Sequence, residues 1–176
     1  MRIISGKYRG KTLNPGKNFN ARPTTDFAKE SLFNILANQY DFETLEVLDL
    51  FSGTGSISFE FASRDCIYIE AVELNHRHAA YISKMGRELS FNQLKVRNAN
   101  AFQYLKSCLR KYDIIFADPP YEMEGVETLP EIILNKNLLK EEGVFILEHS
   151  KNLNFSGHPR MADHRAYGSV NFSFFK

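Results

Sequence analysis

Cysteine is scarce in this chain of 176 residues, and long apolar runs are missing. The two cysteines, Cys66 and Cys108, lie in apolar periodic segments without a CxxC motif or a histidine-rich neighbourhood. They predict reduced core residues of a cytosolic protein, not a disulfide or a zinc site. No apolar stretch approaches the roughly 20 residues needed to cross a bilayer, and the start lacks the apolar core of a signal peptide. We therefore expect a cytoplasmic monomer with no metal and no membrane partner.

A surplus of either charge is also missing, because 22 Lys and Arg residues face 21 Asp and Glu residues. This balance argues against binding nucleic acid through the whole surface. Positive charge is instead concentrated at the start of the chain, before the first acid, Asp26. The cations in this segment are Arg2, Lys7, Arg9, Lys11, Lys17 and Arg22. Such a segment is typical of phosphate contacts, although a solvated amino terminus has the same composition.

The order of apolar patterns predicts an α/β fold of one domain with a small appendage. Two β-prone runs around Gly6 predict a hairpin, followed by a loop and a helix from Thr25 to about Gln39. Strands are then predicted at 45–51, 67–74, 94–97, 112–117 and 144–148, with helices at 57–64, 76–89, 101–110 and 126–139. Right-handed crossovers make this a doubly wound, mainly parallel sheet, and the alternation after Gly168 predicts an antiparallel hairpin at one edge. The predicted division is a basic hairpin and loop at 1–24 and an α/β domain at 25–176.

A glycine-containing turn, Asp49 to Gly55, follows the first predicted strand. Its glycines allow positive φ and close approach of a ligand, and the free N–H groups of the next helix can face that ligand. Glu73 ends the second predicted strand, where a carboxylate can accept both hydroxyls of a ribose. The combination predicts a site for an adenosine-containing cofactor, and a tight turn with a surface glutamate is the alternative. Ser58 replaces the third glycine of a dinucleotide fingerprint, which argues against a nicotinamide oxidoreductase.

A polar residue also follows the third predicted strand. Many enzymes that use S-adenosylmethionine have an acid there, beside the adenine amine, and this chain has Asn100. The side-chain oxygen of Asn100 can accept the same hydrogen bond. It can equally cap the following helix, and both interpretations stay open at this point.

The second motif, Asp118-Pro119-Pro120-Tyr121, follows the fourth predicted strand. Two prolines end the strand and hold a stiff turn. A carboxylate and a proline carbonyl can accept both protons of an exocyclic NH₂ group and favour the pyramidal form that attacks a sulfonium methyl, for which positioning suffices. Tyr121 offers a face on which a base can stack, worth about 1–3 kcal/mol. Taken alone, the motif also fits an ordinary Pro-Pro turn with a loop acid.

Together the two motifs resemble those of class I S-adenosylmethionine-dependent methyltransferases that modify exocyclic nitrogens. The amino-terminal runs are similar to those of the RsmD type, the guanine-N2 methyltransferases of small-subunit (16S) ribosomal RNA. These runs are Arg2 to Lys11, Arg22-Pro23-Thr24-Thr25-Asp26 and Glu30-Ser31-Leu32-Phe33-Asn34. The resemblance spans nearly the whole chain. It implies a Rossmann-like, seven-stranded mixed sheet and a small amino-terminal extension that engages ribosomal RNA.

The resemblance also implies roles for individual residues. The cofactor S-adenosylmethionine would contact Asp49, Phe51, Ser52, Gly53, Thr54, Gly55, Glu73, Leu74, Asn100 and Ala101. The target guanine would be held by Asp118, Pro119, Pro120 and Tyr121, and RNA phosphates would be bound by Arg2, Lys7, Arg9 and Arg22. Residues 150–164 match no motif, so no role follows for them.

Other functions stay open from the sequence alone. The same turn fits any planar NH₂ group, which includes adenine N6 in DNA or RNA and a protein glutamine amide. A non-catalytic RNA-binding assembly factor would have the same basic start. His149, which follows the fifth predicted strand, is a further candidate for substrate contact.

Overall fold

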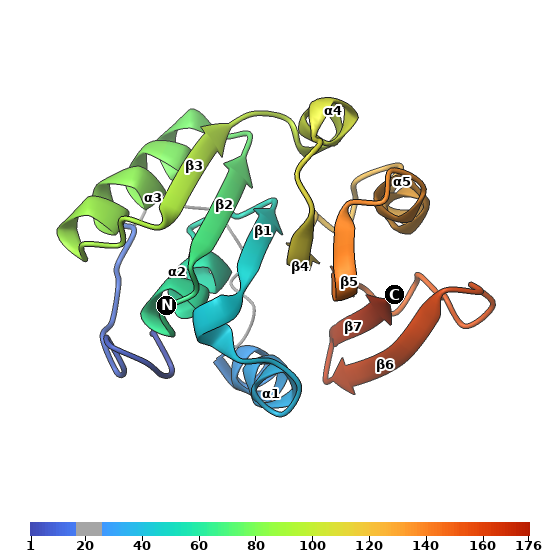
Figure 1. Cartoon of the computed structure of the whole chain (residues 1–176), viewed down its shortest axis with the longest axis horizontal. Helices are drawn as coiled ribbons and strands as arrows, with labels where there is room; N and C mark the ends of the chain where they lie inside the picture. The colour runs from blue at the N-terminus through green and yellow to red at the C-terminus, as the bar shows by residue number, and fades with distance from the viewer. Residues whose placement is uncertain (17–25) are drawn as a thin grey trace.

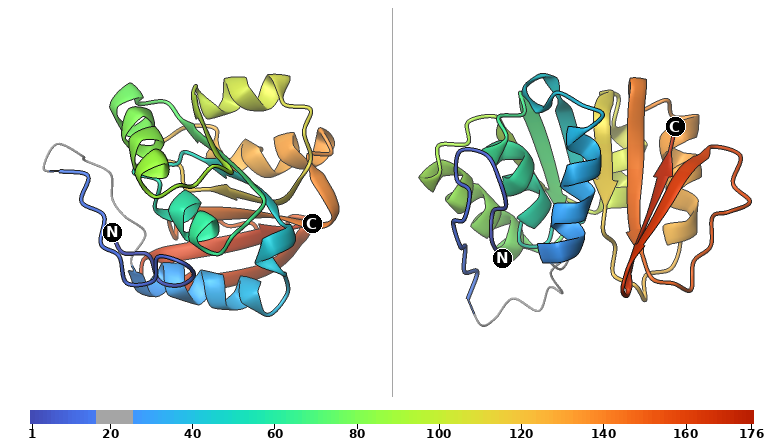
Figure 2. Two further views of the ribbon diagram at one scale, coloured as in Figure 1. Left: turned by 60° about the vertical axis from the view of Figure 1, so that its left-hand side comes forward. Right: turned by 90° about the horizontal axis from the view of Figure 1, so that it is seen from below.

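The computed structural model of the protein describes residues 1–16 and 26–176. The predicted helix start at Thr25 and the predicted RNA contact Arg22 lie outside these residues. A seven-stranded sheet crosses the molecule in the order β3-β2-β1-β4-β5-β7-β6, with helices on both faces (Figures 1 and 2). Strands β1 to β5 are parallel to one another, whereas β7 runs antiparallel to both β5 and β6. The predicted doubly wound mixed sheet is therefore confirmed.

The elements follow one another in the predicted alternation. The strands are β1 (Glu46–Leu50), β2 (Tyr68–Glu73), β3 (Leu94–Asn98), β4 (Tyr112–Ala117), β5 (Leu139–His149), β6 (Met161–Tyr167) and β7 (Val170–Phe175). The helices are α1 (Asp26–Ala37), α2 (Ser56–Ser63), α3 (His76–Glu88), α4 (Ala101–Ser107) and α5 (Leu129–Asn135). Two short 3-10 turns, η1 (Phe42–Thr44) and η2 (Val126–Thr128), precede β1 and α5.

Alternate residues of each central strand face opposite layers, so both faces of the sheet are apolar. Val47 and Ile114 pack into the layer of α1, α2 and α3, whereas Leu48 and Ile115 pack into the layer of α4 and α5. All four side chains have no exposed surface. The two cysteines are free and buried, as predicted. In the parts of the chain that the structure describes, no helix is long and apolar enough to cross a membrane.

The region between α5 and β5 differs from the prediction of a helix at 126–139. Helix α5 ends at Asn135, and Asn137 has φ 53°, which turns the chain in the left-handed region. Leu139 already pairs with Tyr112 of β4, so β5 begins five positions before the predicted start at Val144. Because Leu138 and Leu139 are both buried, their apolar spacing looked like a continuing helix.

The amino-terminal segment, residues 1–13, forms a short hairpin, as predicted, with one isolated antiparallel bridge between Arg2 and Thr12. Backbone hydrogen bonds join its two arms: the N–H of Ile3 donates to the Lys11 carbonyl at 3.0 Å, and that of Gly10 donates to the Ile3 carbonyl at 2.8 Å. Its bend also docks on α2, where the N–H of Lys7 donates to the Ser63 carbonyl at 2.7 Å. Gly6, at φ +77°, lies so close to the end of α2 that a Cβ would come within 1.8 Å of the Ser63 oxygen. The segment is thus docked on the domain, although the predicted boundary between 24 and 25 stays a prediction.

Candidate active site

The carboxyl ends of four parallel strands meet at one level of the sheet. Val72 of β2 pairs with Leu50 of β1, which pairs with Ala117 of β4. Ala117 in turn pairs with Leu147 of β5. The next residue of each strand therefore lies at the same edge, and these residues are Glu73, Phe51, Asp118 and Glu148. The two predicted motifs thus share the edge at which open α/β sheets bind ligands.

The turn after β1 has an unusual backbone. Phe51 has φ 59°, a conformation that non-glycine residues adopt rarely, and Gly53 has φ 55°. Gly55 precedes α2 at φ 81°, and a Cβ there would lie 2.9 Å from the Phe59 ring. The hydroxyl of Ser52 donates to the Asp49 carbonyl at 2.7 Å and holds the turn closed. The turn therefore has a backbone conformation that a ligand can approach closely, and this conformation favours glycine at positions 53 and 55.

Glu73 closes the turn from the neighbouring strand. One carboxylate oxygen accepts the N–H of Gly53 at 2.7 Å, and the other accepts the N–H of Asn75 at 2.7 Å. A carboxylate has about four acceptor positions, so each oxygen keeps the capacity for a further donor. Two such acceptors side by side suit the two adjacent hydroxyls of a ribose. The donor and acceptor set therefore fits an adenosine-containing cofactor.

The residues predicted to flank adenine lie next to this acid. Leu74 exposes 63% of its surface, which offers a flat ring an apolar contact. The side-chain amide of Asn98 donates to the carbonyls of Glu73 and Leu74, at 2.9 and 2.8 Å, and fixes the end of β2. Asn100 caps α4, because its side-chain oxygen accepts the N–H of Gln103 at 3.1 Å. The cap interpretation is thus seen directly, and the contacts of Asn100 and its buried neighbour Ala101 with adenine stay predictions.

Asp49 lies beneath the turn and is 1% exposed. Its carboxylate accepts the N–H of Ser58 at 3.1 Å and makes a short hydrogen bond with the Ser58 hydroxyl. Burial raises the pKa of Asp49 to about 7, even though both bonds from Ser58 oppose the rise. The structure thus ties this predicted cofactor residue to the first turn of α2. In the sequence, the signal for the pair of Asp49 and Ser58 is the hydroxyl residue at the third-glycine position. Taken alone, that residue argues only against a nicotinamide cofactor.

This raised pKa predicts a pH-dependent stability. The ordinary pKa of an aspartate is 3.8. Between about pH 4 and pH 7 the folded protein therefore keeps a proton at Asp49 that the unfolded chain has already released. The stabilising contribution is complete below pH 4 and is lost as the pH rises to about 7. We expect the unfolding free energy of the wild type, measured relative to Asp49→Asn, to fall by on the order of 3 kcal/mol across this range.

Urea denaturation at several pH values measures this difference. Asp65→Asn replaces an exposed acid of the same chemistry and is the matched control. The control should give a curve parallel to that of the wild type. Parallel curves for the wild type and Asp49→Asn would contradict the raised pKa.

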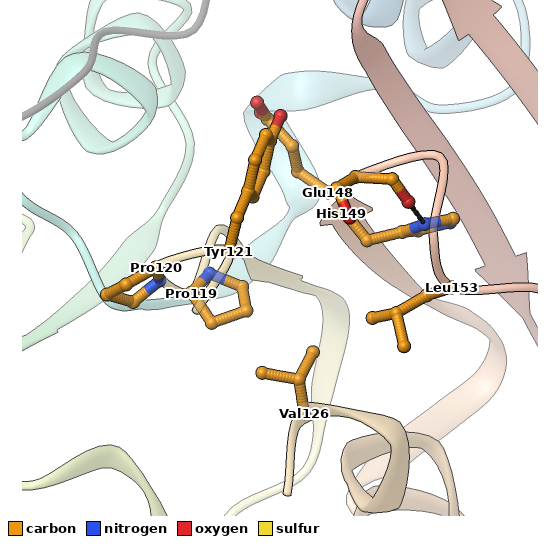
Figure 3. Close-up of a pocket in the computed structure, with 8 residues that line it drawn as sticks. Pro119, Pro120, Tyr121, Val126, Glu148, His149 and Leu153 are labelled. Atoms are coloured by element: carbon orange, nitrogen blue, oxygen red, sulfur yellow. Dashed lines mark hydrogen bonds between the residues drawn. The ribbon is translucent and has the colours of Figure 1, made fainter. Parts of the chain in front are cut away.

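The second motif forms the wall of a small pocket at the same edge. The N–H of Asp118 lies 3.5 Å from the Leu50 carbonyl, which links the turn to β1. The pocket is lined by Pro119, Pro120, Tyr121, Val126, Glu148, His149, Ser150 and Leu153. Its volume of about 10 Å³ is close to that of one water molecule, so a base must stack on its rim or move Tyr121. In Figure 3 the side chains of Tyr121 and Glu148 extend to the same side of the turn, away from Val126.

His149 has both ring nitrogens occupied by protein partners. One nitrogen lies 2.8 Å from the Ser150 carbonyl and the other 2.8 Å from the Ser173 hydroxyl. Burial lowers the pKa of His149, so its ring is neutral at physiological pH. The ring therefore joins the end of β5 to β7 and shapes the pocket from behind. In residues 1–16 and 26–176 there is no group of three His, Cys, Asp or Glu side chains able to hold a metal ion.

The structure separates the predicted RNA contacts of the amino-terminal segment. Arg2 lies near the start of α1, with its guanidinium 3.5 Å from Asp26, and its carbonyl accepts the Lys29 ammonium at 2.6 Å. Lys7 and Arg9 instead lie at the tip of the loop, beside the end of α2. Because α2 runs antiparallel to the strands, its end at Ser63 lies at the edge of the sheet opposite to Asp118, and the tip lies there with it. Of the three predicted RNA contacts that the structure describes, Arg2 alone is therefore close to the active-site edge.

Comparisons with known proteins assign the chain to a family. The sequence model of the family described as Conserved hypothetical protein 95 matches residues 1–176. Ribosomal RNA small subunit methyltransferase D of Buchnera aphidicola subsp. Baizongia pistaciae is 32% identical over 88% of this chain and 78% of its own length. The chain belongs to this methyltransferase family. Ribosomal RNA small subunit methyltransferase D of Haemophilus influenzae is 33% identical over 86% of this chain and 80% of its own.

Solved structures of this methyltransferase type share the whole fold. The Escherichia coli protein yhhF superposes with a TM-score of 0.85 at 27% identity, covering 99% of this chain and 96% of its own. The predicted class I methyltransferase fold and the predicted family are thereby confirmed. Membership of a methyltransferase family also confirms S-adenosylmethionine as the cofactor.

Proposed function

We propose that this protein transfers a methyl group from S-adenosylmethionine to the exocyclic N2 amine of one guanine in 16S ribosomal RNA. The observation that carries the proposal is the position of Asp118 along the sheet. The strand register places it level with the cofactor turn that follows β1 and with Glu73 at the end of β2. An amine held at Asp118 is therefore held at the same edge as the methyl donor. The names of the relatives indicate RNA of the small ribosomal subunit as the substrate.

The cofactor supplies a methyl group on a positively charged sulfur, and the protein supplies the position of the acceptor. Glu73 would hold the ribose, and the turn from Phe51 to Gly55 would hold the methionine part. Asp118 and the Pro119 carbonyl accept the two protons of the guanine amine, which localises its lone pair on nitrogen. The transfer would form the nitrogen–methyl bond as the sulfur–methyl bond breaks with its electron pair left on sulfur. The nitrogen would then release one proton, and we assign Asp118 as its first acceptor. Tyr121 stacks on the base.

Glu148 favours guanine over adenine as the base. It is 3% exposed, it lines the same pocket as Tyr121, and it lies level with Asp118 at the end of β5. Guanine has an N–H donor at N1 beside its N2 amine, whereas N1 of adenine is an acceptor. A second carboxylate next to the one that holds the amine therefore suits the guanine edge and repels that of adenine.

The remaining features of the proposal concern the setting of the reaction. We propose that the protein acts in the cytoplasm as a monomer on 16S RNA or on an assembling small subunit. Residues 1–24 would contact RNA, and residues 25–176 would carry the chemistry. The position of Arg2 at the active-site edge supports the first of these roles.

Transfer of a labelled methyl group tests the reaction and the base together. We expect label from S-adenosylmethionine to enter 16S RNA of small subunits taken from cells that lack this enzyme, and to be recovered as N2-methylguanosine after digestion to nucleosides. Subunits from cells that have the enzyme are the control and should accept little label. Label in N6-methyladenosine would overturn the choice of base. No label above that given by Asp118→Ala would overturn the reaction.

A further inference from the structure

A groove lies at the outer edge of the sheet, between the second half of α3 and the edge strand β3. Its volume is about 260 Å³, near the lower limit of roughly 300 Å³ for sites that take small molecules. Its floor is apolar, with Ile82 and Phe91 buried and Leu94 and Val96 half-buried. Gly86 keeps the groove open, because a Cβ there would already lie 3.3 Å from Leu94. The space suits one flat ring with its sugar.

The rim of this groove is polar and positive. Arg87, Asn92 and Lys95 are exposed along it, and Ser83 is half-buried. None of the nine residues that line the groove is an acid. An apolar floor under a positive rim is complementary to a ligand that has a flat apolar part and a negative charge. A nucleotide of an RNA strand has both.

The positive rim continues into the tip of the amino-terminal segment. The ring of Tyr8 meets that of Phe91 edge to face at 5.3 Å, and its hydroxyl donates to the Leu89 carbonyl at 2.8 Å. The ammonium groups of Lys7 and Lys11 lie 5.5 and 5.6 Å from the centre of the Tyr8 ring. Tyr8 therefore places both lysines beside the groove. The segment and the α3–β3 edge form one positive surface.

We propose that this groove binds an RNA nucleotide distant from the target guanine. Its base lies against Leu94 and Val96, its phosphate is held by Arg87 and Lys95, and the following phosphates reach the loop tip at Lys7. This proposal rests on the proposed function, because it requires RNA as the substrate. It also gives the loop tip a role at the edge opposite to Asp118, where it cannot touch the target base. The substrate RNA therefore spans the protein from the groove to the active site.

Charge reversal and groove filling test the two halves of this proposal. The probe is a fluorescein-labelled 16S RNA fragment that the wild type methylates, and its affinity for the full chain is measured by anisotropy at several salt concentrations. Arg87→Glu with Lys95→Glu should weaken binding at least about tenfold and make the slope of log affinity against log salt shallower by about 0.7, the contribution of the one phosphate that both cations hold. Gly86→Leu, which fills the groove without changing charge, should weaken binding about tenfold at an unchanged slope.

Matched variants keep the test decisive. Lys106→Glu with Lys136→Glu makes the same charge change on exposed residues near α4 and α5, and it should change the affinity less than about twofold. Ser83→Trp fills the rim if Gly86→Leu fails to fold. Melting temperature and affinity for S-adenosylmethionine should match the wild type in every variant that is compared. These two readouts separate loss of RNA binding from loss of the fold.

Three results would overturn the groove site. Wild-type affinity in both filled variants would mean that surface charge acts without the groove. Wild-type affinity in the charge-reversed variant would mean that RNA does not reach this edge. Weaker binding to protein-bearing subunits alone, with unchanged binding to bare RNA, would assign the groove to a protein segment. A wild type that methylates no RNA would overturn the proposed function along with the groove, whereas the other results leave that function intact.

Discussion

Replacing Asp118 by alanine should lower kcat for methyl transfer by about a hundredfold or more while leaving the affinity for S-adenosylmethionine within about twofold. The kcat falls because the amine loses the acceptor that localises its lone pair and takes its proton. The affinity is kept because the groups that fit the cofactor, Gly53 in the turn after β1 and Glu73 at the end of β2, hold each other. Single-turnover transfer to RNA and calorimetry with the cofactor measure the two quantities separately.

Two further variants locate the effect of Asp118. Asp118→Asn keeps the shape and one acceptor oxygen but takes up no proton, so its kcat should lie between those of the wild type and Asp118→Ala. Glu124→Gln changes an exposed acid on the same loop and should leave kcat unchanged. A wild-type kcat in Asp118→Ala would mean that another group holds the amine. An equal fall in cofactor affinity would mean that the two motifs act as one site.

The order of the strands could be predicted because parallel strands have a simple sequence signature. Short apolar-rich runs separated by helical spacing predicted all five parallel strands, and β4 was bounded correctly because Pro119 and Pro120 end it. The start of β5 was missed, since Leu138 continues the helical spacing of Leu134 across the turn at Asn137. Local spacing says which residues are buried and not whether a helix or a strand buries them.

The same limit explains what was missed at the site. Gly53, Glu73 and Asp118 could be placed at one edge because each follows a parallel strand. The direction of the Asp49 carboxylate, toward Ser58, depends on packing beneath the turn, and no spacing encodes it. The basic start was likewise treated as one RNA contact. Its docking on α2 places Arg2 and Lys7 at opposite edges, because the bend at Lys7 is held by the end of α2 at Ser63.

Replacing Glu60 by alanine should lower the free energy of unfolding by about 3–5 kcal/mol. Glu60 is fully buried, and its carboxylate accepts the N–H groups of Ile4 and Ser5 at 2.7 and 3.0 Å. The ammonium of Lys29, also buried, lies 4.0 Å away. Burial lowers the pKa of Lys29, and the charge of Glu60 is the largest influence that raises it. Alanine would leave two N–H groups without their acceptor and would remove the negative charge beside the Lys29 ammonium, which keeps its hydrogen bond to the Arg2 carbonyl.

Urea denaturation of three variants separates charge from packing in this cluster. Glu88→Ala breaks an exposed pair with Lys84 and should cost less than about 1 kcal/mol. Lys29→Met with Glu60→Gln removes both buried charges, so it should be more stable than Glu60→Ala. Equal losses in Glu88→Ala and Glu60→Ala would contradict the role of the buried acid.

Trypsin should also cleave residues 1–13 faster in Glu60→Ala, because this variant lacks the carboxylate that fastens the segment to α2. Unchanged cleavage would mean that Gly6 and the Ser63 carbonyl hold the segment without it.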